Sequence, residues 1–313
     1  MSTQRMLLTD GLQPAGKDVL QPDEDVDDRK GITADELLKE IGDYDAVIVR
    51  GRTKITKNVF EHAKKLKVVG RCGVGVDNID LQSAKENGII VVNAPEATTT
   101  AVAELTMGLI FSLAREIPRA DGGMKEGKWL KKGLVGVELN NKSIGIIGYG
   151  RIGSLVGKYA VSIGMRINAF DVLLAPETTR IHGGKLMSFN DVIQEADFIT
   201  IHTPLTEESR NLINAQVISG MKDGVFIVCT ARGGIIDERA LLDGLNSGKV
   251  AGAALDVYAN EPPTNQGLIN HPKVIATPHI GGQTAEAQVR ASIDIATEVM
   301  NGLNGKKLRW RIV

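Results

Sequence analysis

Residues 143–153 read Ser-Ile-Gly-Ile-Ile-Gly-Tyr-Gly-Arg-Ile-Gly, and this stretch decides the fold of the chain's central part. Ile144 to Ile147 form a short apolar run of the kind that makes a buried parallel strand. Gly148, Gly150 and Gly153 follow in the spacing G-x-G-x-x-G, and apolar residues then recur at helical intervals. The pattern predicts a strand, a glycine-rich turn and a helix in direct succession.

Each glycine has a separate role in such a turn. Gly148 would make the tight turn, Gly150 would let a pyrophosphate approach the backbone, and Gly153 would let helix and strand pack closely. The first N–H groups of the helix, at Arg151 and Ile152, would face the phosphates, because a helix N-terminus favours anions.

A second expected strand runs from Arg166 to Phe170 and ends at Asp171. A carboxylate there can bind the ribose 2′-hydroxyl of NAD and would repel the 2′-phosphate of NADP. A structural turn explains an isolated G-x-G-x-x-G equally well. Strand, glycines, helix, second strand and acid together favour a dinucleotide site, and we expect NAD as the cofactor.

The composition is that of an ordinary globular protein. The 313 residues suffice for two domains, and 42% of them are hydrophobic and 24% charged. A net charge of −1 gives no overall basic field for binding nucleic acid or a membrane surface. Met1 to Asp10 lack the apolar core of a signal peptide, and the two cysteines make no disulfide framework. We expect a cytoplasmic protein without a metal site.

Strands and helices alternate along the chain, which predicts an α/β protein with parallel sheets. In the first part the expected strands are Met6–Thr9, Ala46–Val49, Lys67–Gly70 and Ile89–Val92, and the expected helices are one after the N-cap Thr33, Val59–Leu66 and Leu81–Glu86. No element is predicted for residues 11–32.

The pattern changes at residue 98. Ala101–Arg115 is apolar on several faces, which predicts a buried helix, and residues 116–142 resemble a projecting arm. Six expected strands make a complete doubly wound dinucleotide fold: 144–147, 166–170, 198–202, 225–229, 252–256 and 274–277. The final helix, Thr284–Met300, returns to the first part. We expect a discontinuous domain, residues 1–97 with 284–313, and a dinucleotide-binding domain, residues 98–283.

Ligands of an open parallel sheet bind beyond the carboxyl ends of its strands. Four expected strands end in residues capable of chemistry: His202 to Pro204, Thr230 to Gly234, Asp256 with Glu261 after it, and Thr277 to Gly282. Hydride transfer to a keto group needs a group that holds the carboxylate and polarises the carbonyl, a group that donates a proton to the alkoxide, and a group that tunes the proton donor.

Three residues at these strand ends suit the three roles. Arg232 can hold a carboxylate, because a guanidinium pairs bidentately and stays charged. His279 can move the proton, because imidazole titrates near neutrality. Glu261 can tune it, because a carboxylate bonded to an imidazole favours the charged ring. Taken alone, such an arginine is usually a surface ion-pair partner, such a histidine is more often structural, and Glu261 could belong to an ordinary turn. Their common location beyond adjacent strand ends is what favours a site.

Three motifs carry a resemblance to the D-isomer-specific 2-hydroxyacid dehydrogenase family over nearly the whole chain: Ala-Arg-Gly-Gly at 231–234, Asp-Val-Tyr-Ala-Asn-Glu-Pro at 256–262 and Pro-His-Ile-Gly-Gly at 278–282. The resemblance implies a Rossmann dinucleotide-binding domain and a smaller flavodoxin-like substrate-binding domain. It implies that Arg232 binds the substrate, that His279 is the acid/base and that Glu261 orients it.

The resemblance also implies the residues that line NAD. Asp256 would lie beside the nicotinamide carboxamide. The others are His202, Thr203, Pro204, Thr230, Ala231, Gly281 and Gly282.

The first domain resembles the family members that act on a phosphorylated 2-hydroxy acid. The matching stretches are residues 49–54 and residues 69–80. The turn at Val74 and Gly75 can offer N–H groups to a carboxylate. A substrate phosphate would meet cations that end neighbouring strands, or else these are plain surface charges: Arg50 and Arg71, with Arg52 and Lys54 close behind.

The activity implied is NAD-dependent oxidation of D-3-phosphoglycerate to 3-phosphohydroxypyruvate, the first step of serine synthesis. Two alternatives stay open: a glyoxylate or hydroxypyruvate reductase of the same family, and a corepressor-like protein that binds NAD without turnover. The intact set of Arg232, Glu261 and His279 favours an enzyme.

The helix from Ala101 and the basic arm to Lys132 resemble the family's dimer interface, so we expect a homodimer, with a tetramer open. Lys131 matches a position from which some relatives reach the neighbouring subunit's phosphate site. Residues 97–100 and Cys229-Thr230 depart from the family pattern. Because the chain stops at Val313, we expect no feedback by serine through an added C-terminal domain.

Overall fold

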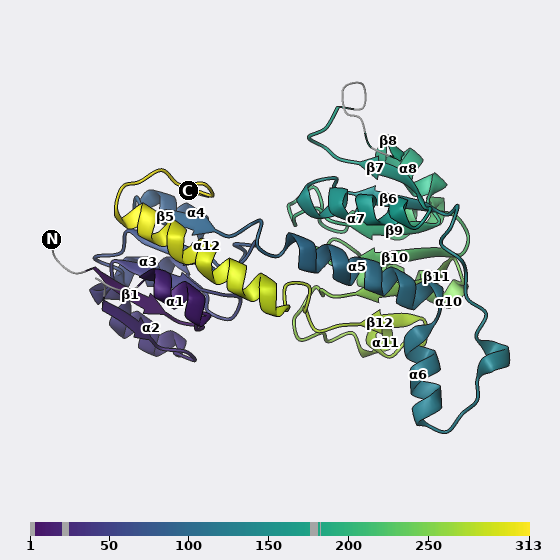
Figure 1. The fold of residues 1–313 in the computed structure, drawn as a ribbon, viewed down its shortest axis with the longest axis horizontal. Coiled ribbons are helices and arrows are strands. Elements are labelled where there is room, and N and C mark those ends of the chain that lie inside the picture. Colours follow the sequence, from purple (N-terminus) through teal and green to yellow (C-terminus); the bar gives the residue numbers. More distant parts are fainter. Residues whose placement is uncertain (1–3, 21–24, 176–180, 182) are drawn as a thin grey trace. The chain divides into compact units, whose positions relative to one another are not determined.

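The computed structural model describes residues 4–20, 25–175, 181 and 183–313. The chain divides into two compact units, residues 1–99 with 282–313 (unit 1) and residues 100–281 (unit 2) (Figure 1). Each unit has its own parallel sheet, with helices packed on both faces. The predicted α/β class is therefore confirmed.

The sheet of unit 1 has five parallel strands in the order β2-β1-β3-β4-β5, which is the flavodoxin-type order. Side chains of a strand point alternately to opposite faces, so Leu7 enters one core while Met6 and Leu8 enter the other. The strands are β1 Arg5–Leu8, β2 Asp25–Asp28, β3 Ala46–Val49, β4 Val68–Arg71 and β5 Ile90–Asn93.

In the described part of unit 1, five α-helices cover the two faces of this sheet. The helices α1 and α12 pack together on the face of Met6 and Leu8, and α2 to α4 cover the other. The helix α2 starts at its predicted N-cap, where Thr33 and Glu36 make the reciprocal bonds of a capping box. The helices are α1 Pro14–Leu20, α2 Ala34–Glu40, α3 Lys57–His62, α4 Leu81–Glu86 and α12 Ala285–Leu303, with a 3₁₀ turn, η1, at Ile41–Asp43.

Residues 11–32 contain α1 and β2, neither of which the sequence predicts; residues 21–24 lie outside the described part. The strand β2 reads Asp-Val-Asp-Asp, and aspartate is depleted in strands. It pairs in parallel with β1, and Arg5 bonds Asp25 and Asp27 across the two strands at 2.9 Å each. The strand thus has charged pairs with β1 where a typical strand has alternating apolar residues, and such pairs leave no pattern in the local sequence.

The sheet of unit 2 has seven parallel strands in the order β12-β11-β10-β9-β6-β7-β8. The chain builds outward from β6 to β8 and then returns to the other side at β9. The switch point between β6 and β9 is where ligands bind in such sheets. The strands are β6 Ser143–Ile147, β7 Arg166–Phe170, β8 Gly184–Leu186, β9 Phe198–Ile201, β10 Val225–Cys229, β11 Val250–Leu255 and β12 Val274–Ala276.

Six of these strands are predicted, and β8 is additional. It has three residues, none of them fully buried, so the sequence carries no periodic apolar signal for it.

The helices α5 and α7 pack on one face of the sheet and α8 to α11 on the other. Their bounds are α5 Thr99–Ala114, α6 Ile117–Lys125, η2 Lys131–Gly133, α7 Arg151–Ser162, α8 Phe189–Glu195, α9 Ala215–Gly220, α10 Glu238–Ser247 and α11 Gln266–Ile269.

The helix α5 is largely buried, as its apolar composition predicts, but Glu104, Gly108 and Phe111 form an exposed stripe along it. The arm at residues 116–142 extends away from the sheet of unit 2 (Figure 1) and exposes Trp129 by 78%. Within the described residues, no helix is both long and apolar enough to cross a membrane.

Candidate active site

The glycine-rich turn after β6 has the geometry that its spacing predicts. Gly148 has a φ of 90°, in the left-handed region that favours glycine, and a Cβ there would lie 2.8 Å from the carbonyl carbon of His202. A Cβ on Gly153 would overlap the carbonyl oxygen of Gly148. At Gly150, by contrast, no described atom lies within 4 Å of such a Cβ. The backbone at Gly150 is therefore open to a ligand.

The helix α7 begins directly at this turn. Its N-cap is Gly150, and no side chain of the described residues caps it. The first turn of a helix leaves backbone N–H groups without an intrahelical acceptor, and such a helix start favours an anion. The carboxylate of Asp171 borders the turn, since it accepts the N–H groups of Tyr149 and Leu173 at 2.8 Å each. Each oxygen keeps a lone pair for a ribose hydroxyl.

Two buried polar atoms beside the turn have no partner in the described part of the chain: Nδ1 of His202 and Oγ1 of Thr203. The other ring nitrogen of His202 lies 2.9 Å from the Thr200 hydroxyl. Burial lowers the pKa of His202 to about 3, so the ring is neutral at pH 7. Unpartnered polar atoms, an open glycine and an uncapped helix start fit a dinucleotide with its phosphates.

The hydroxyl of Thr230 is already engaged. It lies 2.9 Å from the hydroxyl of Thr106 in α5, which in turn lies 2.8 Å from the Val102 carbonyl oxygen. The side chain of Thr230 thus ties the end of β10 to α5, and its backbone is what remains for a cofactor.

The predicted acid/base pair is formed within unit 2. Nδ1 of His279 lies 2.8 Å from Oε2 of Glu261, and the two side chains are 49% and 39% exposed. No partner is recorded for Nε2 of His279 among the described residues. That nitrogen is therefore not committed to a described residue.

Asp256 holds the turn that carries His279. It is only 1% exposed, at the end of β11. One carboxylate oxygen accepts the Thr277 hydroxyl at 2.6 Å and the Ile280 N–H at 2.8 Å, and the other accepts the Gly281 N–H at 2.8 Å. Between these bonds His279 has a φ of 53°, which is uncommon for a residue other than glycine. The role of Asp256 that the structure shows is to hold the backbone turn that carries His279.

The turn that carries Glu261 is fixed by Tyr258, whose hydroxyl lies 2.9 Å from the carbonyl oxygens of both Leu255 and Thr277. A Cβ on Gly233 would overlap the Tyr258 carbonyl, so only glycine lets the Arg232 turn pack this closely. The sequence alone did not single out Tyr258 as a support, although it lies inside a quoted motif. The three motifs thus form one packed cluster.

Arg232 is half-buried in this cluster. Its Nη1 donates to the carbonyl oxygen of Ala231 at 2.7 Å. The predicted catalytic three, Arg232, Glu261 and His279, therefore all lie on turns beyond the carboxyl ends of β10, β11 and β12, which are neighbouring parallel strands.

Unit 1 carries the predicted substrate-binding residues. Arg71 ends β4 and donates from Nη1 to the Cys72 carbonyl at 3.0 Å. A Cβ on Gly73, which has a φ of 139°, would overlap that nitrogen, so glycine lets Arg71 lie across the turn. The N–H groups of Val74 and Gly75 follow, with no acceptor recorded among the described residues.

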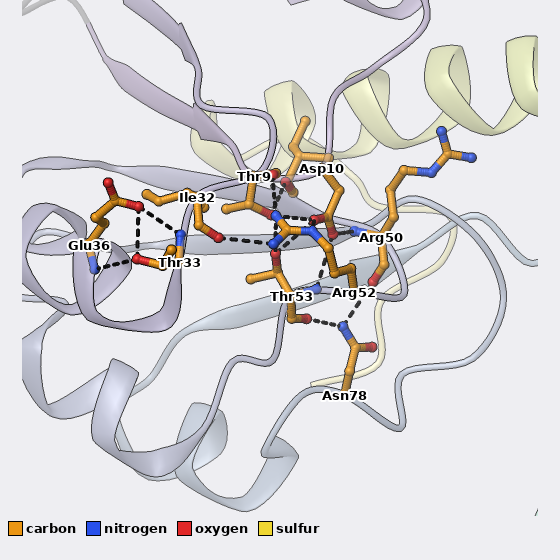
Figure 2. A network of polar contacts seen from close by, with 10 residues as sticks. Thr9, Asp10, Ile32, Thr33, Glu36, Arg50, Arg52, Thr53 and Asn78 are labelled. Carbon is orange, nitrogen blue, oxygen red and sulfur yellow. Dashed lines mark hydrogen bonds and ion pairs between the residues drawn. The ribbon is translucent and has the colours of Figure 1, made fainter. Parts of the chain in front are cut away.

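Arg52 is not the available cation that the sequence suggests. Its guanidinium bonds the carboxylate of Asp10 and the carbonyl oxygens of Thr9 and Ile32 (Figure 2). The bonds span 20 to 43 positions of the chain, which no local pattern reveals. Lys131, on η2 of unit 2, is exposed.

Comparison with known proteins places the chain in a family. The family model for the NAD-binding domain of D-isomer-specific 2-hydroxyacid dehydrogenases matches residues 107–281. A solved structure from Thermus thermophilus is 32% identical, with a TM-score of 0.91, and the match covers 99% of this chain and all of that one. A glyoxylate reductase from Paecilomyes thermophila is 30% identical, with a TM-score of 0.91 over 100% of this chain and 99% of that one.

Curated relatives of higher identity are D-3-phosphoglycerate dehydrogenases. That of Methanocaldococcus jannaschii is 45% identical over 96% of this chain and 58% of its own length. That of Sus scrofa is 43% identical over 97% of this chain and 57% of its own length. This chain thus spans a little over half the length of these relatives. Together with the geometry of the turn after β6, the matches show that the chain belongs to the D-isomer-specific 2-hydroxyacid dehydrogenase family, whose NAD-binding domain occupies residues 107–281.

Proposed function

We propose that this chain oxidises D-3-phosphoglycerate to 3-phosphohydroxypyruvate with NAD, the reaction that opens serine synthesis. The observation that carries the proposal is the 2.8 Å bond between His279 and Glu261, beyond the same sheet edge as the dinucleotide turn. The choice of substrate rests on relatives of that name, at 43% to 45% identity.

The proposed chemistry divides between cofactor and protein. Bound NAD would accept a hydride from C2 of the hydroxy acid. Nε2 of His279 takes the hydroxyl proton, while Glu261 holds Nδ1 and stabilises the imidazolium that forms. Arg232 binds the substrate carboxylate and carbonyl oxygen, because its planar guanidinium can reach both. In the reverse direction His279 returns the proton to the forming alkoxide.

Unit 1 supplies the remaining substrate contacts in this proposal. The N–H groups of Val74 and Gly75 bind a carboxylate, and Arg50 with Arg71 binds the phosphate. Lys131 is assigned to the phosphate site of a neighbouring subunit, as a cation on an exposed arm.

A second candidate is glyoxylate or hydroxypyruvate reduction. The specific observation in its favour is the glyoxylate reductase from Paecilomyes thermophila, which matches along its full length, whereas the D-3-phosphoglycerate dehydrogenases match over little more than half of theirs. The identity of 30% against 43% to 45% favours the phosphorylated substrate.

We also propose a homodimer in the cytoplasm. The exposed stripe of α5 includes Phe111, 41% exposed, and the arm exposes Trp129 and Val135 by 78% and 83%. Large exposed apolar side chains on α5 and on the arm favour an interface, and a second copy is the commonest partner. Cys72 and Cys229 are free buried thiols, as expected in a reducing compartment. A monomer in sedimentation at micromolar concentration would contradict the dimer.

The test of the activity is an NADH absorbance assay with phosphohydroxypyruvate, hydroxypyruvate and glyoxylate, run beside the His279→Ala variant. We expect the highest kcat/KM with phosphohydroxypyruvate. A preference for either unphosphorylated acid would support the reductase instead. NADH binding without turnover of any of the three would indicate a binding protein.

A further inference from the structure

A buried carboxylate organises the turn after β3. The side chain of Asp10, just beyond β1, is 5% exposed. It accepts the Arg50 N–H at 2.7 Å, the Thr53 hydroxyl at 2.8 Å and the Arg52 Nε–H at 3.0 Å (Figure 2). Asp10 therefore fixes the backbone of the residue that the proposed function makes a phosphate ligand.

Asn78 fixes the same turn from the other side. Its Nδ2 donates to the carbonyl oxygen of Arg50 at 2.9 Å and to that of Thr53 at 2.6 Å. Both backbone polar groups of Arg50 are thus held by side chains from other parts of the chain. A turn held in this way loses little conformational entropy when a ligand binds.

The guanidinium of Arg52 completes the arrangement. Beyond Asp10, it donates from Nη1 to the Ile32 carbonyl at 3.0 Å and from Nη2 to the Thr9 carbonyl at 2.8 Å. It also forms the ion pair with Asp10, at 2.9 Å. Arg52 therefore neutralises the Asp10 carboxylate, which lies against the backbone of Arg50.

The side chain of Arg50 behaves differently from that of Arg52. Figure 2 shows it extending away from the cluster. No hydrogen bond or ion pair is recorded for its guanidinium among the described residues. Because Asp10 is already satisfied by Arg52 and Thr53, it does not draw the Arg50 guanidinium into an internal salt bridge.

We propose that Asp10, Arg52 and Asn78 are positioning residues that hold Arg50 ready for an anionic group of the substrate. Arg52 acts through Asp10 and does not touch the substrate. The inference rests on the proposed function in one respect, because it takes the anionic group to be the substrate phosphate.

The central variant is Asn78→Ala, which releases the Arg50 carbonyl and leaves every charge in place. We expect KM for phosphohydroxypyruvate to rise about 5- to 20-fold, the effect of one or two lost hydrogen bonds, with kcat unchanged. Hydroxypyruvate, which has no phosphate, should keep its kcat/KM. The matched control is Asn87→Ala, which loses a comparable bond to Ser83 elsewhere in unit 1 and should change neither substrate.

A double-variant cycle separates positioning from general destabilisation. In an Arg50→Ala background, Asn78→Ala should cost nothing further for phosphohydroxypyruvate, since the residue that it positions is gone. Equal losses for both substrates, or full additivity with Arg50→Ala, would overturn the proposal.

Arg52→Lys serves as the second variant if Asn78→Ala does not fold. A lysine keeps the charge but cannot reach Asp10, Thr9 and Ile32 together, so the positioning account expects the same rise in KM. Wild-type KM in Arg52→Lys, with its fold confirmed by the thermal transition, would overturn the role of Arg52.

Inorganic phosphate provides a readout that does not need the substrate. Millimolar phosphate should raise the Tm of the wild type and of Asn87→Ala, but not of Arg50→Ala, and it should raise that of Asn78→Ala less. If these Tm shifts are seen but the enzyme prefers hydroxypyruvate, the proposed substrate is refuted and the positioning role of Asp10, Arg52 and Asn78 is retained. No phosphate response and no preference for the phosphorylated acid would overturn both.

Discussion

Nδ1 of His279 lies 2.8 Å from Oε2 of Glu261, and each residue sits on a turn held by buried hydrogen bonds of its own. The pair is solvent-facing. Asp256 holds the backbone around His279 through Thr277 and Ile280, and Glu261 holds the ring. The orientation of the imidazole is thus set before any substrate arrives.

Replacing the tuning carboxylate should slow the reaction without abolishing it. In Glu261→Gln the amide can still bond Nδ1 but no longer stabilises the imidazolium. We expect kcat to fall by about 10- to 100-fold, less than the roughly 10² to 10⁴ for loss of a general acid–base residue. Stopped-flow NADH oxidation would measure it, with NADH affinity as the control. An unchanged kcat would remove Glu261 from the mechanism.

Asp256→Asn should damage both stability and activity. The amide nitrogen would face an N–H or hydroxyl donor in place of an acceptor, so at least one charge-assisted hydrogen bond is lost and a donor is left buried. We expect unfolding to become easier by about 2 to 4 kcal/mol and kcat to fall, because the turn is no longer held at the left-handed His279. Urea unfolding that matches the wild type would show that the carboxylate does not clamp this turn.

His202 should make the fold sensitive to mild acid. Burial lowers the pKa of its ring to about 3 in the folded chain, so between pH 6.5 and 3 the unfolded chain takes up a proton that the folded chain refuses. The contribution of His202 to stability should therefore fall as the pH drops below 6.5, by at most about 1.4 kcal/mol per pH unit.

The His202→Gln variant should lose that part of the slope in urea unfolding measured between pH 7.5 and pH 5. The matched control is His62→Gln, at an exposed position on α3. Identical slopes in the wild type and His202→Gln would show that the ring is protonated in the fold.

The second and third glycines of the turn, Gly150 and Gly153, should respond differently to a methyl group. Gly153→Ala places a Cβ against the Gly148 carbonyl, so we expect a loss of stability of more than about 2 kcal/mol. In Gly150→Ala the added methyl group meets no described atom within 4 Å, so the Tm should hold while NADH affinity falls. Calorimetric unfolding and NADH fluorescence titration check the pair. Undiminished NADH binding by Gly150→Ala would place the pyrophosphate elsewhere.

Much of the fold is predictable because its signals are local. The capping box at Thr33 and Glu36, the apolar run 144–147 and the glycine spacing all act within a few residues. The strand β2 could not be predicted, since its aspartates pair with residues that are distant in sequence.

The candidate site follows the same division. His279, Glu261 and Arg232 lie in motifs that can be recognised in the sequence. The order of the parallel strands places all three at one edge of the sheet. Arg52 bonds Asp10, which lies 42 positions away in the sequence. No local sequence pattern indicates this bond, so the sequence predicts the same availability for Arg52 as for Arg50. The sequence alone cannot distinguish an arginine that bonds other protein groups, such as Arg52, from one whose guanidinium makes no recorded hydrogen bond or ion pair among the described residues, such as Arg50.

The central claim is that His279 carries the proton in hydride transfer. The most direct measurement is kcat of His279→Ala with the preferred acid, beside the dissociation constant for NADH in the same variant. The account predicts a fall in kcat of about 10² to 10⁴ with NADH affinity nearly unchanged. Wild-type turnover in His279→Ala would contradict it.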